Sequence, residues 1–192
     1  MSTEYQLVVI DPPWSYGKVT APRVKKHRGR ALGGHYKPMT IEEIEKQTPI
    51  HLAAPDVHVY LWVTNPKLPL AFALLEKWGL TYQTTLTWVK TTSAGETANN
   101  GLGWYWRGAT EHILLATRGV LSIPTALRRV NVIHAPRTGH SRKPDAFYKL
   151  LDEVYPTMPR IDLYARSRHP GWEAWGDQVD QTAGQLALYP TI

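Results

Sequence analysis

Short apolar runs recur along the chain and predict the buried strands of a β-sheet. The first run, YQLVVI at residues 5–10, has the continuous apolar character of a strand that is buried on both faces. The stretch at 81–90 is rich in threonine and aromatic residues, which favour extended structure. The predicted strands are residues 5–10, 57–63, 81–90, 111–117, 130–135 and 160–166.

The segments between these runs predict helices. Thr40 followed by Glu43 forms a capping box at the start of MTIEEIEKQ. An amphipathic pattern at 66–79 ends at a glycine, and Ser141 with Pro144 opens a helix that runs to Tyr155. Strands that alternate with helices predict an α/β fold with helices on both faces of the sheet. Residues 15–38 and 91–110 lack periodicity and are predicted to be long loops, which in a compact domain are usually functional or disordered.

Length and composition fit one globular domain. The 192 residues are 43% hydrophobic, and we expect a domain over residues 1–180 followed by a tail over 181–192. There is no cysteine, so a disulfide or a thiolate metal site is excluded, and the histidines lack metal-ligand spacing. No apolar run approaches the ~18 residues of a membrane span, and the N-terminus lacks an apolar signal segment. We expect a soluble, cytoplasmic protein with no metal and no membrane partner.

Basic residues are concentrated in two segments that contain no acid. The chain has a formal charge of +6, and neither the stretch between Asp11 and Glu42 nor that between Glu111 and Asp145 contains Asp or Glu. The first holds Lys18, Arg23, Lys25, Lys26, Arg28, Arg30 and Lys37; the second holds Arg118, Arg128, Arg129, Arg137, Arg142 and Lys143. Such segments favour contact with a phosphate backbone. The alternative is an ordinary solvated surface.

The tetrapeptide DPPW at residues 11–14 follows the first predicted strand and places a carboxylate, two prolines and an indole ring in succession. A proline after Asp11 favours an extended backbone, and two prolines remove two N–H donors. The Asp11 carboxylate and the Pro12 carbonyl can therefore accept hydrogen bonds from one NH₂ group, while Trp14 offers a flat surface for its ring. Two such acceptors would orient the amine lone pair toward an electrophile. The alternative is a rigid turn in which Trp14 belongs to the core.

These residues and their neighbours resemble the MT-A70 family of S-adenosylmethionine-dependent adenine-N6 methyltransferases. The resemblance extends from about residue 5 to about residue 180 in five ordered blocks: DPPW at 11–14, YLWVTN to TWVKT at 60–91, ATEHILLATRG at 109–119, HSRKPDAFY at 140–148 and RIDLYARSRHPGWEAWGDQ at 160–178. It implies a Rossmann-like class I methyltransferase fold with a mostly parallel sheet and with the catalytic motif ahead of the cofactor-binding strand. It is most similar to the bacterial and phage single-domain members.

The resemblance also implies site residues. Catalytic roles fall to Asp11, Pro12, Pro13 and Trp14. The cofactor S-adenosylmethionine would contact Asp11, Lys143, Asp162, Arg166, Arg168, His169, Asp177 and Gln178, with Lys143 on its carboxylate and Asp162 on its ribose. Without the resemblance, Lys143 and Asp162 would be interpreted as solvated surface charges.

Substrate contacts are expected near the base and along the phosphates. Tyr16 would form a wall of the base pocket, and Glu111 resembles a residue close to the base. Trp104, Trp106 and Arg107 could clamp an extruded base, or the aromatic rings could pin a loop to the core. The basic and flanking residues assigned to the substrate are Lys25, Lys26, Arg28, His35, Tyr36, Arg128 and Arg129.

The function implied is methyl transfer to the N6 amine of adenine in DNA. The same reaction on RNA is one alternative, and a catalytically silent nucleic-acid-binding partner subunit is another. A homodimer is an assembly that the sequence allows.

Overall fold

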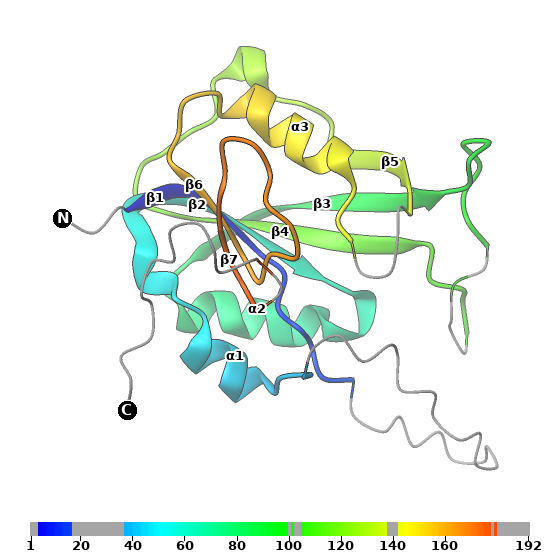
Figure 1. The fold of residues 1–192 in the computed structure, drawn as a ribbon, viewed down its shortest axis with the longest axis horizontal. Helices are drawn as coiled ribbons and strands as arrows, with labels where there is room; N and C mark the ends of the chain where they lie inside the picture. Colours follow the sequence, from blue (N-terminus) through cyan, green and yellow to red (C-terminus); the bar gives the residue numbers. More distant parts are fainter. Residues whose placement is uncertain are drawn as a thin grey trace.

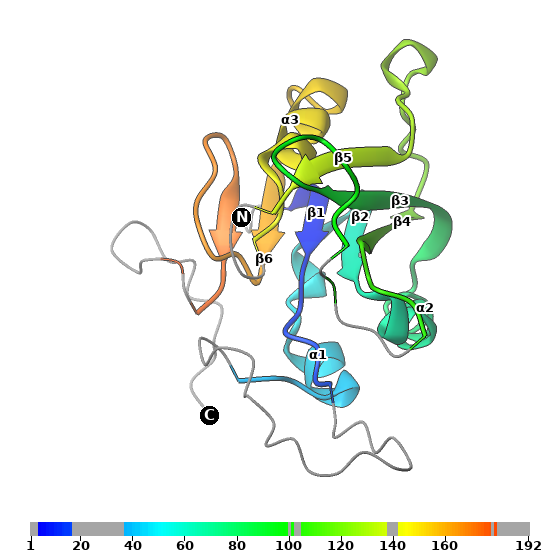
Figure 2. The same cartoon turned by 90° about the vertical axis from the view of Figure 1, so that its right-hand side faces the viewer.

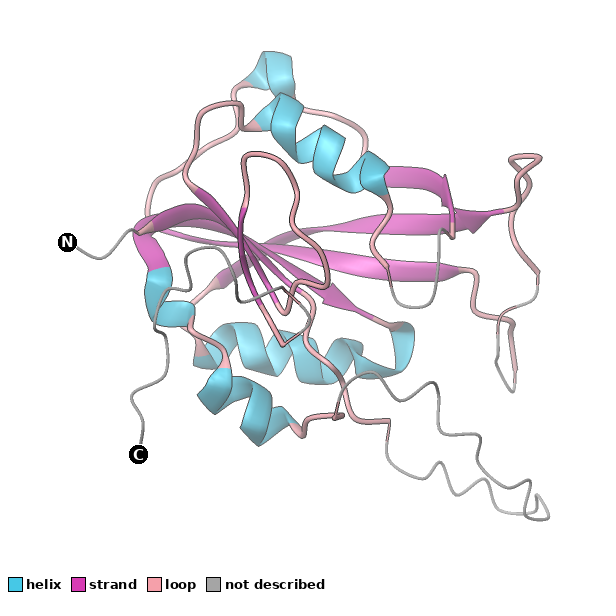
Figure 3. Ribbon diagram, viewed as in Figure 1, coloured by secondary structure: helices cyan, strands magenta, loops and turns pink. Residues whose placement is uncertain are grey.

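The computed structural model describes residues 4–16, 37–99, 101, 105–137, 142–177 and 179. In these residues a seven-stranded sheet has the order β5-β3-β4-β2-β1-β6-β7. Figure 1 labels the strands and helices, and Figure 3 separates them by colour. The elements are β1 Tyr5–Ile10, α1 Ile41–Gln47, η1 Ile50–Leu52, β2 Ala53–Val63, η2 Asn65–Lys67, α2 Leu68–Lys77, β3 Thr81–Thr91, β4 Thr110–Arg118, η3 Thr125–Leu127, β5 Val132–Pro136, α3 Asp145–Val154, β6 Arg160–Leu163 and β7 Glu173–Trp175.

Strand β4 makes the sheet mixed, so the expectation of a mostly parallel sheet holds for the pairings that do not involve β4. It runs antiparallel to both of its neighbours, β2 and β3, while the other neighbouring strands pair in parallel. The register pairs Val63, the last residue of β2, with His112 near the start of β4. The first residues of β4 therefore lie at the edge of the sheet where the parallel strands end, which we call the carboxyl edge.

Helices cover both faces of the sheet, as the alternating pattern predicted. Helix α3 lies on one face, and α1 and α2 lie on the other (Figures 1 and 2). Strand β2 contributes to both cores, because Leu61 packs in the cluster that includes Leu74 of α2, while Trp62 packs in the cluster that includes Phe147 of α3. The Trp62 and Phe147 rings meet edge to face, with centroids 4.9 Å apart. Burial on both faces explains the continuous apolar runs of β1 and of the second half of β2.

The capping box predicted at Thr40 is confirmed. The Glu43 backbone N–H donates to Thr40 Oγ1 at 3.2 Å, and the Thr40 backbone N–H donates to Glu43 Oε2 at 2.7 Å. The predicted helix at 66–79 forms as η2 and α2, and Gly79 follows with a φ of +66° that suits glycine. None of the described helices is long and apolar enough to cross a membrane.

Two strand predictions need correction. The strand expected at 160–166 ends at Leu163, because Tyr164 has a φ of +61° that turns the chain out of the sheet. The three-residue strand β7 has no apolar run of its own and was not predicted. The predicted loop at 15–38 lies mostly outside the described residues.

A buried histidine ties the segment after β4 to the sheet at the edge opposite the carboxyl edge. His58 is 3% exposed, and its Nδ1 lies 2.6 Å from the hydroxyl oxygen of Tyr155, which lies 2.8 Å from that of Tyr60. Its Nε2 lies 3.0 Å from the carbonyl oxygen of Leu121. Burial lowers the pKa of His58 below 6.5, although the Leu121 carbonyl opposes this effect. The fold therefore holds the neutral ring.

This burial predicts a loss of stability in acid. Because the native state disfavours the protonated ring, the contribution of His58 is complete above its ordinary pKa and falls as the pH drops toward its lowered native pKa. Each unit of pKa shift is worth about 1.4 kcal/mol. We expect the unfolding free energy to fall between about pH 7.5 and about pH 5.5, and to fall less in His58→Gln. Urea denaturation at both pH values measures the unfolding free energy of the wild type and of His58→Gln. An equal fall in unfolding free energy in the two proteins would contradict the prediction.

Candidate active site

The carboxyl edge between β1 and β6 is where this fold places a ligand. From β1 the chain proceeds to β2 on one side, while β6 and β7 lie on the other side, so the strand order reverses at β1. Ligands of open α/β sheets bind at such a switch point, outside the carboxyl ends of the strands. Ile10 pairs with Leu61 and with Leu163, and Asp11 therefore emerges between β2 and β6.

A buried lysine joins two carboxylates at this point. Lys143 Nζ lies 3.4 Å from Asp11 Oδ2 and 3.3 Å from Asp162 Oδ1. The exposed fractions of the three side chains are 6% for Lys143, 3% for Asp162 and 24% for Asp11. The structure thus brings together three residues expected to serve one site, and Asp11 is the member that remains open to a ligand.

Burial and the neighbouring charges act against each other on the pKa values of Lys143 and Asp162. Burial lowers the pKa of Lys143, but Asp162 and Asp11 outweigh that effect and the pKa is raised overall. Burial raises the pKa of Asp162 against the opposing influence of Lys143 and Tyr148. Lys143 therefore stays charged, and Asp162 is a weaker acid than an exposed aspartate.

Tyr148 of α3 fixes the far side of Asp162, a contact that sequence reasoning missed. Its hydroxyl donates to Asp162 Oδ2 at 2.6 Å, and burial together with Asp162 raises the tyrosine pKa. His169 stacks on the Tyr148 ring with centroids 3.6 Å apart. With both carboxylate oxygens engaged and little exposure, Asp162 positions Lys143. The sequence signal for this contact was the position of Tyr148 in KPDAFY, one helical turn after the residues that begin α3.

The DPPW turn is held by backbone hydrogen bonds on both sides. The Trp14 N–H donates to the Pro12 carbonyl at 2.8 Å, and the Met39 N–H donates to the Pro13 carbonyl at 2.8 Å. The expectation that no local donor reaches these carbonyls is wrong, because Trp14 itself bonds to Pro12. A carbonyl oxygen has two lone pairs, so the Pro12 carbonyl retains one for a ligand.

The Trp14 ring lies in the core beneath this turn. Its exposed fraction is 7%, and its Nε1–H donates to the Trp62 carbonyl at 3.0 Å. The indole therefore anchors the turn to β2. Its role as a stacking surface for a base stays a prediction.

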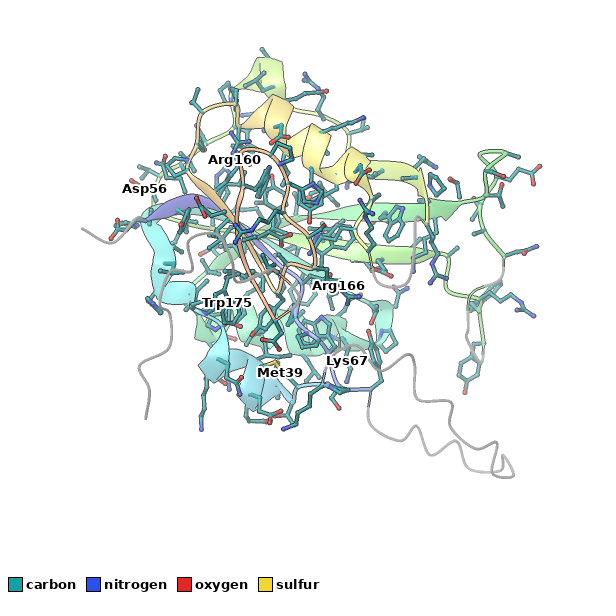
Figure 4. All side chains as sticks on the ribbon, viewed as in Figure 1. Met39, Asp56, Lys67, Arg160, Arg166 and Trp175 are labelled. Carbon is teal, nitrogen blue, oxygen red and sulfur yellow. The ribbon has the colours of Figure 1, made fainter. Side chains whose placement is uncertain are left out.

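Polar side chains from β2, β3 and β4 extend the site along the edge. The Tyr16 hydroxyl lies 2.6 Å from Thr64 Oγ1, and Lys67 Nζ lies 5.3 Å from the centroid of the Tyr16 ring. Glu111 Oε1 accepts from Lys90 Nζ at 2.6 Å. Lys90 was not predicted, although a cation at the end of a predicted strand is a usable signal. Figure 4 labels Lys67 and Arg166 near this edge and Asp56 at the opposite end of β2.

Some predicted residues lie away from Asp11. Arg128 and Arg129 precede β5, at the opposite edge of the sheet, where they line a cavity of about 690 Å³ together with His58 and Leu150. Trp106 is 89% exposed, so the alternative that it pins a loop to the core is wrong. Lys25, Lys26, Arg28, His35, Tyr36, Trp104 and Gln178 lie outside the described residues.

The loops after β6 and β7 carry the remaining predicted cofactor contacts. Arg166, Arg168 and His169 follow β6, and Asp177 follows β7 by two residues. Because both strands run parallel to β1, the loops that carry these residues begin at the carboxyl edge. Asp177 is exposed, in contrast to Asp162.

Comparison with known proteins identifies the family. The sequence profile of the MT-A70 family matches residues 5–178. The chain belongs to the MT-A70 family. The expected Rossmann-like methyltransferase fold is confirmed, with β4 as its reversed strand.

Relatives of this MT-A70 chain include three named methyltransferases. It is 26% identical to Type II methyltransferase M.MunI of a Mycoplasma species over 92% of this chain and 78% of the relative. It is 32% identical to N6-methyladenosine RNA methyltransferase MTA1 of Cryphonectria parasitica over 91% of this chain and 52% of the relative. It is 30% identical to the human N(6)-adenine-specific methyltransferase METTL4 over 91% of this chain and 37% of the relative. The chain thus spans about half or less of the two longer relatives.

The Tyr148 contact yields a test of the buried cluster. Tyr148→Phe removes the donor to Asp162 and leaves a buried carboxylate oxygen unpaired, so we expect the unfolding free energy to fall by about 1–3 kcal/mol. Tyr82→Phe is the control, because the Tyr82 hydroxyl contacts Thr85 at an exposed position. Urea denaturation measures both variants. Equal stability of the two would show that the Tyr148 hydroxyl does not hold Asp162.

Proposed function

We propose that this MT-A70 chain transfers a methyl group from S-adenosylmethionine to the N6 amine of adenine in DNA. The observation that carries the proposal is the position of Asp11. Its carboxylate is partly exposed at the switch point, with Oδ2 directed to the buried Lys143. Its other oxygen is available to accept from an amine, next to the remaining lone pair of the Pro12 carbonyl.

The charges around Asp11 fit the proposed cofactor. Lys143 faces two carboxylates, so the cluster carries one excess negative charge when both are ionised. A positively charged sulfur close to Asp11 would balance that charge. When bound, S-adenosylmethionine supplies an electrophilic methyl group on such a sulfur. We assign its carboxylate to the loop arginines Arg166 and Arg168, because Lys143 is buried and already engaged by Asp11 and Asp162. The exposed Asp177 is better placed than the buried Asp162 for the ribose hydroxyls.

The protein groups would act mainly by orienting the adenine amine. The N6 lone pair is delocalised into the ring, which makes the amine a poor nucleophile. The free Asp11 oxygen and the Pro12 carbonyl can each accept one N–H bond, which draws the nitrogen toward tetrahedral geometry. The lone pair then points away from both acceptors. Fixed acceptors of this kind lower the barrier because they need no reorganisation during the reaction.

The reaction also requires a route for one proton. With S-adenosylmethionine bound, methyl transfer from its sulfur to N6 would leave the nitrogen positively charged and with a surplus proton. Asp11 accepts its surplus proton or passes it to water. Lys143 remains charged throughout and holds the second Asp11 oxygen in place.

The assignment to DNA rests on the pattern of relatives. Similarity to the bacterial Type II methyltransferase spans most of that protein, whereas the fungal relative is named as an RNA methyltransferase. An adenine in a duplex must be extruded to reach Asp11. Exposed Trp106 and Arg107, on the loop before β4, are suited to contact the extruded base or its neighbours.

The first test removes the proposed acceptor. We expect Asp11→Ala to lower the methylation rate by at least about 100-fold, because the amine loses both its orienting partner and its proton acceptor. Binding of S-adenosylmethionine, measured by calorimetry, should weaken because Asp11 also faces the proposed cofactor sulfur, but by much less than the methylation rate falls. Asp56→Asn is the matched control, since Asp56 bonds to Val120 at the opposite edge. Methylation by Asp11→Ala at the rate of the control would refute the mechanism.

The second test identifies the polymer. The chain is incubated with tritiated S-adenosylmethionine and either DNA or RNA of matched sequence, and the label is located at N6 of adenine. We expect label in DNA. Label confined to RNA would overturn the substrate assignment. Binding of nucleic acid without label in either polymer would favour the silent partner subunit.

A further inference from the structure

A second pocket lies on the carboxyl edge, beside the ends of β3 and β5. It has a volume of about 340 Å³. None of its residues is assigned above to the base or the cofactor, and Arg137 is its member from an acid-free basic segment. Its lining consists of Thr91, Thr92, Ser93, Ala98, Asn99, Pro136 and Arg137.

The backbone that carries this pocket is internally hydrogen-bonded. Thr91 pairs with Pro136 across the parallel ladder, so Arg137 emerges beside Thr92. The chain after β3 folds back on itself, with the Thr92 N–H donating to the Glu96 carbonyl at 2.8 Å and the Ala98 N–H donating to the Lys90 carbonyl at 2.8 Å. Gly95 makes the turn with a φ of +84°. The polar side chains are therefore presented from a preformed turn.

The lining has the chemistry of an anion site. It offers three hydroxyl groups, one amide and one guanidinium, and no acid. Arg137 is exposed and makes no hydrogen bond or ion pair with a described residue. Glu96 lies in the same turn but does not line the pocket. An arginine with two donors in a fixed fork, surrounded by hydroxyl groups, is suited to the paired oxygens of a phosphate.

We propose that this pocket binds a phosphodiester of the nucleic acid whose adenine reaches Asp11. The inference rests on the proposed function and adds to it the path of the substrate. The nucleic acid runs along the carboxyl edge from β1 toward β5. The acid-free segment between Glu111 and Asp145 acts through Arg137 at the carboxyl edge.

Sheet geometry predicts where the contacted phosphate lies. In the strand order, β3 is third and β5 is fourth from β1. At about 4.8 Å per strand, the pocket lies about 14–19 Å from Asp11 across the sheet. The register places Asp11 level with Leu86 of β3, so Thr91 lies five residues, or about 17 Å, further along the strand. The two displacements combine to about 22–26 Å. Phosphates of one strand advance about 3.4 Å along a duplex axis, so the contact falls about six to eight base pairs from the target adenine.

The charge of Arg137 can be tested through the salt dependence of binding. Fluorescence anisotropy with a labelled duplex is recorded over a range of sodium chloride concentrations. Arg137→Gln should reduce the slope of log affinity against log salt by about one and weaken binding roughly eightfold at about 0.1 M salt. Lys46→Gln, which removes an exposed charge from the last turn of α1, should leave the slope unchanged. An unchanged slope in Arg137→Gln would overturn the proposal.

The position of the contact is tested by neutralising single phosphates. In a duplex whose methylated adenine has been located by sequencing, one phosphate at a time is replaced by an uncharged methylphosphonate. Wild-type protein should lose affinity at a phosphate about six to eight base pairs from that adenine, and Arg137→Gln should be insensitive there. Equal sensitivity of both proteins at every position would refute the assignment.

The outcomes separate this proposal from the proposed function. Methylation with a wild-type salt slope in Arg137→Gln would refute the phosphate site and leave the activity intact. Binding that depends on Arg137 without methylation would refute the activity and leave the site intact. Binding of S-adenosylmethionine by Arg137→Gln should match that of wild type, which shows that the variant is folded.

Discussion

The buried ammonium group of Lys143 is the constraint on which the site depends. It lies between Asp11, which follows β1, and Asp162, which belongs to the neighbouring strand β6. Lys143 itself precedes α3, the helix that covers one face of the sheet. Removing one partner of a buried ion pair typically costs about 3–5 kcal/mol, because the remaining charge is left uncompensated. The pairing of β1 with β6, the docking of α3 and the orientation of Asp11 are thus parts of one arrangement. Tyr148 completes it by occupying the second oxygen of Asp162.

The two ends of the sheet differ in what they bury. At the carboxyl edge, charged groups approach the surface, and Asp11 and Lys90 are incompletely covered. At the opposite edge, the polar groups of His58, Tyr60 and Tyr155 are buried and bonded to one another. Self-contained hydrogen bonding leaves these groups little capacity for a ligand, whereas the carboxyl edge retains free acceptors and donors.

Features set by local sequence were predicted, and features set by pairing between distant segments were not. The capping box of Thr40 and Glu43 depends on residues three positions apart, so its pattern is visible in the chain. Asp11 was identified because two prolines follow a buried strand. The reversed direction of β4, by contrast, is fixed by its partners and has no signature in its own residues. The Lys90–Glu111 and Tyr148–Asp162 contacts join separate elements, and Trp14 looked available because its bond to Trp62 is invisible in sequence.

The reversal of β4 has a consequence for how this architecture diversifies. Because β3 ends and β4 begins at the same edge, the segment between them is a hairpin connection whose two ends are anchored side by side. Such a connection can lengthen, shorten or change composition without shifting β1 and β6, which place Asp11 and Asp162. Sequence variation there would change the surface beside the site while the sheet that places Asp11 stays constant. One core can in this way serve enzymes with different substrates.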